Sequence, residues 1–177
     1  MPLLIASVAI LGGMFGIYVS DAVADADKDI LEVMAENASQ DPILYDMQAY
    51  IKEAEGGDVS ETMLFTGYNT GAYFEYAGFT HVYMDARPEL LMEAVNGVTD
   101  ILPEYGTIYS QYFQGYDYDC PIGEALQNSL DAYGFDYLVV QKGVENQLYA
   151  WLEGAGESSG YVIVMENDVA ALYEKCN

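Results

Sequence analysis

The sequence predicts an α/β fold with three layers, in which a mainly parallel sheet of about five strands ends in a C-terminal antiparallel hairpin. Short apolar runs bounded by glycine alternate with segments of helical periodicity after residue 58. The run 135–141 is almost continuously apolar, which suits a strand buried on both faces of a parallel sheet. Only three residues, 166–168, separate the last two runs, and this spacing predicts the hairpin.

The first element is an uncharged segment of 19 residues, Pro2–Ser20. As a helix it is just long enough to cross ~30 Å of hydrocarbon, and it predicts a transmembrane helix within residues 1–22 that contacts the lipid bilayer. A signal peptide is a second interpretation, because alanines at 22, 24 and 26 offer A-x-A cleavage sites. A buried core helix is the third.

No basic residue precedes Lys28, although a helix that inserts itself usually has positive charge on its cytoplasmic side. Either Met1 is an internal start and the chain is the tail of a longer polytopic protein, or it is a true N-terminus with a weak signal. The apolar segment predicts a location at the cell membrane. In both cases we expect the following residues outside the cytoplasm, because the positive-inside rule gives them no reason to stay inside.

A helical stalk is predicted over residues 23–57, with a second helix that begins at Asp41-Pro42 and stops at Gly56-Gly57. The α/β domain then occupies residues 58–177. Its predicted strands are 62–66, 81–85, 135–141, 161–165 and 169–173. Its predicted helices are 72–77, 89–95, 121–133 and 145–152, with further helical turns around 108–113.

The composition excludes one class of partner. The 177 residues carry a formal net charge of −24, and a reader of phosphate backbones needs a cationic face, so no nucleic-acid binding is expected. The chain has two cysteines, Cys120 and Cys176. An even count outside the cytoplasm allows a disulfide between them, and two unrelated thiols are the alternative.

Four short motifs occur in a familiar order: Gly-Tyr-Asn-x-Gly at 67–71, Asp-Ala-Arg-Pro-Glu at 85–89, Tyr-Gly-Phe-Asp-Tyr-Leu-Val-Val at 133–140 and Asn-Asp-Val-Ala-Ala-Leu-Tyr at 167–173. Together they resemble the extracytoplasmic C-terminal domain of bacterial polytopic membrane glycosyltransferase-like proteins of the GT-C type. In those proteins the domain follows the last transmembrane helix.

The resemblance implies a parent protein that transfers sugar from a lipid-phosphate-linked donor outside the membrane. The catalytic acid of such proteins lies between early transmembrane helices that this chain lacks, so no catalytic residue carries over. The resemblance thus implies a non-catalytic domain that supports acceptor or partner binding, including a glycan or a lipid-linked sugar. No cofactor is expected.

Asp85, Arg87 and Glu89 follow a predicted strand, where open α/β sheets place ligands. One interpretation is a polar pocket in which Arg87 holds a phosphate or a carboxylate. The other, which we favour, is structural: Arg87 pairs with Asp85 or Glu89 and fixes the turn from strand to helix.

Two further segments offer ligand-binding residues. Tyr68 and Asn69 lie in the glycine-bounded turn, which either cradles an anion or is a tight turn with an asparagine cap. Tyr112, Tyr116 and Asp117 lie in the aromatic stretch 105–118, which either holds a sugar ring or packs over the sheet edge.

Two rivals to this function remain open. A stand-alone membrane-anchored or secreted binding module predicts no coding sequence joined upstream. A carboxylate-based hydrolase would use Asp85 with Glu89, or Asp117 with Asp119, and predicts a cleft with one carboxylate of raised pKa. No metal site is expected, because the single histidine lacks a recognisable ligand set and no calcium-binding loop occurs.

Overall fold

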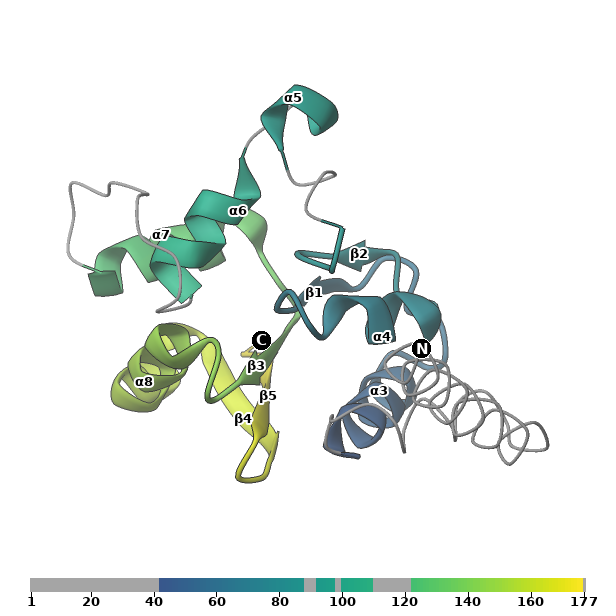
Figure 1. Cartoon of the computed structure of the whole chain (residues 1–177). Coiled ribbons are helices and arrows are strands. Elements are labelled where there is room, and N and C mark those ends of the chain that lie inside the picture. The colour runs from purple at the N-terminus through teal and green to yellow at the C-terminus, as the bar shows by residue number, and fades with distance from the viewer. Residues whose placement is uncertain (1–41, 88–91, 98–99, 110–121, 177) are drawn as a thin grey trace, which may run out of the picture. The chain divides into compact units, whose positions relative to one another are not determined.

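The computed structural model describes residues 42–87, 92–97, 100–109 and 122–176, which belong to one compact unit (Figure 1). The predicted transmembrane segment and most of the predicted stalk lie outside the described residues. Within the described ranges, no helix is long and apolar enough to cross a membrane. The membrane helix therefore stays a prediction.

The compact unit contains a five-stranded sheet in the order β2-β1-β3-β5-β4. β1 pairs in parallel with β2 and with β3, whereas β5 is antiparallel to both β3 and β4. The mixed α/β sheet with a C-terminal antiparallel hairpin is thus confirmed. The strands are β1 (Met63–Phe65), β2 (His81–Val82), β3 (Tyr137–Gln141), β4 (Tyr161–Glu166) and β5 (Ala170–Lys175).

Helical segments connect these strands and cover the sheet. They are α3 (Ile43–Ala54), α4 (Gly71–Tyr76), α5 (Glu93–Asn96), α6 (Ile101–Glu104), the π-helical turn η2 (Tyr105–Tyr109), α7 (Ile122–Tyr133), α8 (Asn146–Ala155) and the 3₁₀ turn η3 (Gly156–Ser159). The two longest, α3 and α7, each carry apolar residues on one stripe, which is the pattern of helices that cover a sheet.

Side chains that alternate along the strands pack into two separate hydrophobic cores, one on each face of the sheet. Leu64, Tyr137 and Val139 pack with α3 and α4 in one cluster. Phe65 and Leu138 pack with α7, α8 and the η2 tyrosines in the other. Helices therefore lie on both faces, and residues that alternate along one strand point to opposite layers.

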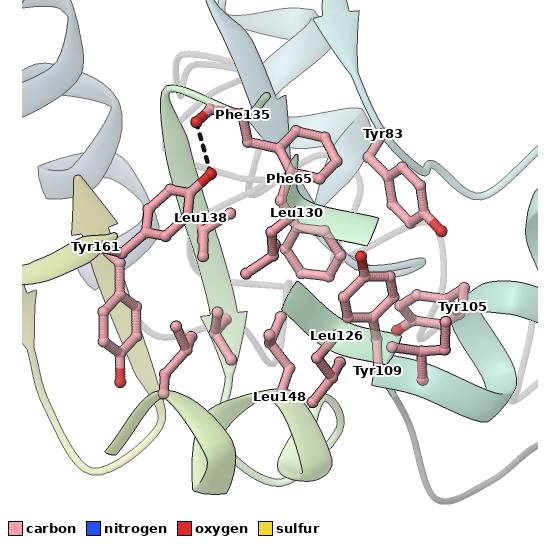
Figure 2. Packing of buried hydrophobic residues seen from close by; sticks show 14 of the residues in the cluster. Phe65, Tyr83, Tyr105, Tyr109, Leu126, Leu130, Phe135, Leu138, Leu148 and Tyr161 are labelled. Carbon is pink, nitrogen blue, oxygen red and sulfur yellow. Dashed lines mark hydrogen bonds between the residues drawn. The ribbon is translucent and has the colours of Figure 1, made fainter. Parts of the chain in front are cut away.

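The aromatic cluster of the second face is tied to the sheet by a buried hydrogen bond. Figure 2 shows the hydroxyl of Tyr161 donating to the carbonyl oxygen of Phe135, at 2.8 Å. The ring of Phe65 contacts those of Tyr83, Tyr109 and Phe135, with ring centroids 4.8–5.7 Å apart. Such stacked, tilted and edge-on pairs add to the stability that area burial provides.

Helix α3 lies in the body of the domain and not in the predicted stalk that ends at Gly56-Gly57. The compact unit begins at Pro42. Leu44, Met47 and Ile51 are almost fully buried against the sheet, and the Gln48 side-chain amide donates to the carbonyl oxygen of Tyr73 at 3.0 Å. The glycine pair marks the end of this helix rather than the edge of the domain.

Candidate functional site

The carboxyl ends of the three parallel strands form the candidate site. Here the chain leaves β1 toward α4 on one face of the sheet and leaves β3 toward α8 on the other (Figure 1). Neighbouring strands whose connections diverge in this way create the crevice in which open α/β sheets bind ligands. The elements that meet at this edge are the turn 67–71, the segment 85–87, η2 and the start of α8.

The turn after β1 is closed by its own hydrogen bonds. The Gly67 N–H donates to the Thr70 hydroxyl oxygen at 3.0 Å, and the N–H groups of Thr70 and Gly71 donate to the Gly67 carbonyl at 3.0 and 3.1 Å. The predicted tight turn is present, but Thr70 rather than Asn69 closes it. Asn69 is exposed, and no side chain caps the short helix α4.

Both glycines of this turn are required by close approach of other groups. A Cβ atom on Gly67 would lie 2.0 Å from Oε1 of Glu145, and one on Gly71 would lie 1.9 Å from the carbonyl oxygen of Met84. The turn therefore contacts the segment after β2 on one side and the start of α8 on the other. This double contact joins the three strand ends into one site.

Glu145 is the central polar group of this edge, and it is not among the site residues that the sequence predicts. Its side chain is fully buried. Its carboxylate accepts hydrogen bonds from the Tyr105 hydroxyl at 2.5 Å and from the Gln141 N–H at 2.7 Å. Burial raises the pKa of Glu145 to about 7, although these hydrogen bonds oppose the shift.

Tyr105 extends this network toward the turn. Its hydroxyl also accepts a long hydrogen bond of 3.5 Å from the Tyr68 N–H. Burial and the neighbouring Glu145 carboxylate raise the pKa of Tyr105, so the phenol stays protonated and serves as a donor. Figure 2 shows its ring beside Tyr109 at one side of the aromatic cluster. The carboxyl–phenol pair can hold a proton, but Glu145 has no exposed surface.

Asp85 and Arg87 form the second polar group at this edge. The buried Asp85 carboxylate accepts a hydrogen bond from the Arg87 backbone N–H at 2.7 Å and another from its Nε at 2.9 Å. The Arg87 guanidinium also binds the Glu75 carboxylate of α4, at 2.5 and 2.6 Å. This geometry agrees with the structural interpretation, in which Arg87 pairs with Asp85 and fixes the turn. Glu75 is an additional partner of Arg87.

The electrostatics of this cluster follow from its burial and pairing. Burial pushes the pKa of Asp85 upward, but the hydrogen bonds from Arg87 outweigh it and hold that pKa below its usual range. Burial and the nearby Asp85 raise the pKa of Glu75. The Arg87 side chain is 51% exposed, so its outer edge reaches the surface.

We expect Asp85→Ala to lower the free energy of unfolding by about 1–3 kcal/mol at neutral pH, because the Arg87 N–H and guanidinium lose a buried acceptor. Glu75→Ala, which removes the more exposed partner, should cost less than about 1 kcal/mol. Urea unfolding of both variants measures this loss of stability.

Because the pKa of Asp85 is lowered, the contribution of Asp85 to stability is present above its unfolded pKa and disappears as the pH falls below about 4. Equal losses for the two variants would contradict the assignment.

The other predicted site residues are only partly brought together. Tyr68 is half-buried and packs against the aromatic core, next to the exposed Asn69. Cys176 is exposed. The remaining predicted residues, Glu89, Tyr112, Tyr116, Asp117 and Cys120, lie outside the described residues, so their roles and the disulfide stay predictions.

The beginning of the aromatic stretch is core rather than surface. Tyr105 and Tyr109, with Ile108 between them, are almost fully buried. For these two tyrosines the packing interpretation therefore holds. In the part of the chain that the structure describes, no three of the histidine, cysteine, aspartate and glutamate side chains are grouped in a way that would hold a metal ion.

No family model matches the chain, and no curated protein or solved structure is significantly similar to it. The resemblance to GT-C type proteins therefore stays a prediction that rests on the four motifs.

Proposed function

We propose that this chain is a non-catalytic extracytoplasmic domain of a membrane-embedded glycosyltransferase-like protein. Residues 2–20 anchor it, and its carboxyl edge supports binding of an acceptor, glycan or lipid-linked sugar. The four motifs suggest the parent protein, and the structure of the carboxyl edge supports a binding role over a chemical one.

The observation that carries the binding role is that Asp85 and Glu145, the two buried acidic residues described at this edge, are engaged within the fold. Asp85 is held by Arg87, and Glu145 by Tyr105 and the Gln141 backbone. A general acid or base has to reach its substrate within hydrogen-bond distance. At the surface, this edge instead presents the exposed Asn69, part of the Arg87 guanidinium and the part of Tyr68 that the aromatic core leaves uncovered.

These three side chains suit a sugar phosphate. An aromatic ring stacks on the apolar face of a sugar, an amide bonds its hydroxyl groups, and the edge of the guanidinium that Asp85 and Glu75 leave free can bind a phosphate oxygen. Gly71 contacts the Met84 carbonyl and the Asp85 backbone, so the turn that carries Tyr68 lies next to the segment that carries Arg87. The binding surface is therefore continuous across β1 and β2.

The test is titration calorimetry of the full chain in detergent micelles with a polyprenyl-phosphate-linked hexose. We expect saturable binding that Tyr68→Ala weakens about fivefold, since loss of one stacked ring costs about 1 kcal/mol. Tyr76→Ala removes an exposed tyrosine of α4, 59% accessible, and should change the affinity less than about twofold. Polyprenyl phosphate without the sugar separates phosphate from sugar recognition. Absence of binding, or equal effects of the two variants, would refute this surface.

One observation favours the hydrolase alternative: Glu145 has the raised pKa that a catalytic acid needs. Its carboxyl is fully buried, however, and Asp85 has a lowered pKa and an ion-pair partner. Release of free hexose during the titration, abolished by Glu145→Gln, would favour the hydrolase over the binding domain.

A further inference from the structure

Strand β4 forms one edge of the sheet and exposes apolar side chains on both of its faces. It is last in the strand order, and within the described residues it pairs with β5 alone (Figure 1). Val162 is 37% exposed and Ile163 is 42% exposed. Natural proteins usually protect such an edge with charge, proline or a short strand, because it invites another strand to pair.

Over its second half, β4 has backbone groups that point away from β5 and that no other described strand pairs with. Cys176 N–H donates to the Gly160 carbonyl at one end of the hairpin, and Asn167 N–H donates to the Ala170 carbonyl at the other. Antiparallel pairs alternate between bonded and non-bonded residues. The bonded pairs at the two ends of the hairpin fix this alternation. From the Gly160 end it leaves Ile163 as a non-bonded residue, and from the Asn167 end, beyond the register shift after Ile163, it leaves Glu166 as one. The N–H and C=O groups of Ile163 and Glu166 therefore point away from β5.

The first half of the same edge is already occupied by a side chain. The Tyr161 N–H donates to Ser159 Oγ at 3.2 Å, and the Ser159 hydroxyl contacts the Tyr161 carbonyl oxygen at 3.4 Å. These are the groups of Tyr161 that face away from β5. The turn η3 thus closes the edge at Tyr161, and an added strand would begin to pair at Ile163.

An open groove of about 260 Å³ lies between the first half of β4, Tyr173 of β5, the C-terminal part of α8 and η3. Its apolar lining includes Leu152, Tyr161, Ile163 and Tyr173, and Glu153 and Glu157 also line it. Tyr173 donates a hydrogen bond to Glu153 at 3.0 Å, which holds that carboxylate in place.

The lining of the groove fits a long basic side chain. A lysine or arginine lays its alkyl chain on apolar and aromatic surface and directs its cation to carboxylates. A second copy of this chain fits poorly, because each copy has a formal charge of −24 and brings its own glutamates. The complementary occupant is therefore a basic segment of another protein.

We propose that an extended, lysine- or arginine-bearing segment of a partner protein pairs with β4 as a sixth strand. Backbone groups of Ile163 and Glu166 hold the segment, and one of its basic side chains enters the groove between β4 and α8. Strand addition of this type takes affinity from backbone bonds and specificity from pockets for alternate side chains. Strand β4 lies beyond β3 and β5 from the strands β1 and β2, next to which the proposed sugar-binding residues lie, so the inference goes beyond the proposed sugar binding.

The experiment measures fluorescence anisotropy of short labelled peptides with the full chain in detergent micelles. The probe alternates lysine and valine. A matched peptide has N-methyl groups on the backbone nitrogens of the pairing side, which keeps every charge but removes the donors. We expect the N-methylated peptide to bind at least about tenfold more weakly, since two or more backbone bonds are lost.

Charge reversal in the chain supplies the second arm. Glu157→Lys on the groove should weaken binding at least about fivefold. Glu124→Lys is the matched control, because it makes the same charge change at an exposed site on α7 and should alter binding less than about twofold. Circular dichroism and the Tm of each variant verify folding.

Three outcomes would overturn the proposal. Equal binding of the N-methylated peptide would mean that attraction to the acidic chain is purely electrostatic. Equal effects of the two charge reversals would place the peptide elsewhere. A dimer in sedimentation analysis that Ile163→Lys dissociates would make a second copy the occupant of β4. If the peptide did not bind but the sugar titration still showed binding, only the strand-pairing proposal would fail. The two proposals are therefore tested separately.

Discussion

Gly71→Ala is expected to lower the free energy of unfolding by about 3 kcal/mol and the Tm by roughly 10 °C. The new Cβ would lie 1.9 Å from the Met84 carbonyl oxygen and 2.9 Å from the Asp85 Cα, and both are backbone atoms that cannot rotate away. Overpacking of this kind forces the turn after β1 away from the segment after β2. Thermal and urea unfolding measure the loss.

Gly154→Ala is the matched control for this substitution. Gly154 lies in helix α8, and a Cβ there meets nothing within 4 Å. Alanine is the better helix former, so this variant should be more stable by about 0.5–1 kcal/mol. If both variants were equally stable, the close contact between the two segments would be refuted.

A related test concerns Gly67, whose Cβ would collide with the Glu145 carboxylate rather than with backbone. Gly67→Ala should be destabilising in the native chain and much less so in the Glu145→Ala background, since the second change removes the colliding group. A double-mutant cycle measures this coupling. Additive effects would show that the two residues do not touch.

The second large effect concerns the pH dependence that Glu145 gives to stability. Burial raises its pKa from 4.5 to about 7, so the folded chain binds this proton more tightly than the unfolded chain does. Its contribution is therefore fully present below about pH 4.5 and is lost as the pH rises through about 7. We expect the loss to be on the order of 3 kcal/mol.

Glu145→Gln removes this titration while an amide still fills the site. The variant should gain stability relative to the native chain between about pH 5 and pH 8, measured by urea unfolding at several pH values. Glu124→Gln is the control for the general repulsion in an acidic chain, because Glu124 is exposed on α7. Parallel curves for the native chain and Glu145→Gln would contradict the buried, raised-pKa carboxyl.

The periodicity of the sequence predicted most elements of the body because those elements are bounded by glycine and proline. The strands at 137–141, 161–166 and 170–175 lie within one or two residues of their predictions, and the last pair is antiparallel as its short turn indicated. The sequence predicts the residues of helix α3 as part of a stalk. A local pattern shows that a helix has an apolar face, but it does not show which element that face packs against. Only the assembled sheet shows that α3 covers Leu64 and Val139.

The site was predicted less completely than the fold. Arg87 and Asp85 are close in sequence, so their pairing followed from local chemistry, whereas Glu75 joins them only because α4 returns beside β2. The sequence predicts Glu145 only as the first residue of a helix, since nothing local distinguishes it from 28 other acidic residues. The available signal was its place just after the most apolar strand, where a parallel sheet places polar groups at its carboxyl edge.

The location of the domain outside the cytoplasm is tested most directly by thiol labelling of Cys176, which is exposed. The full chain carrying Cys120→Ser, expressed in bacterial cells, is treated with a membrane-impermeant maleimide before and after permeabilisation. We predict that Cys176 is labelled in intact cells and that the chain stays with the membrane fraction. Labelling only after permeabilisation would place the domain on the cytoplasmic side and contradict the extracytoplasmic binding role.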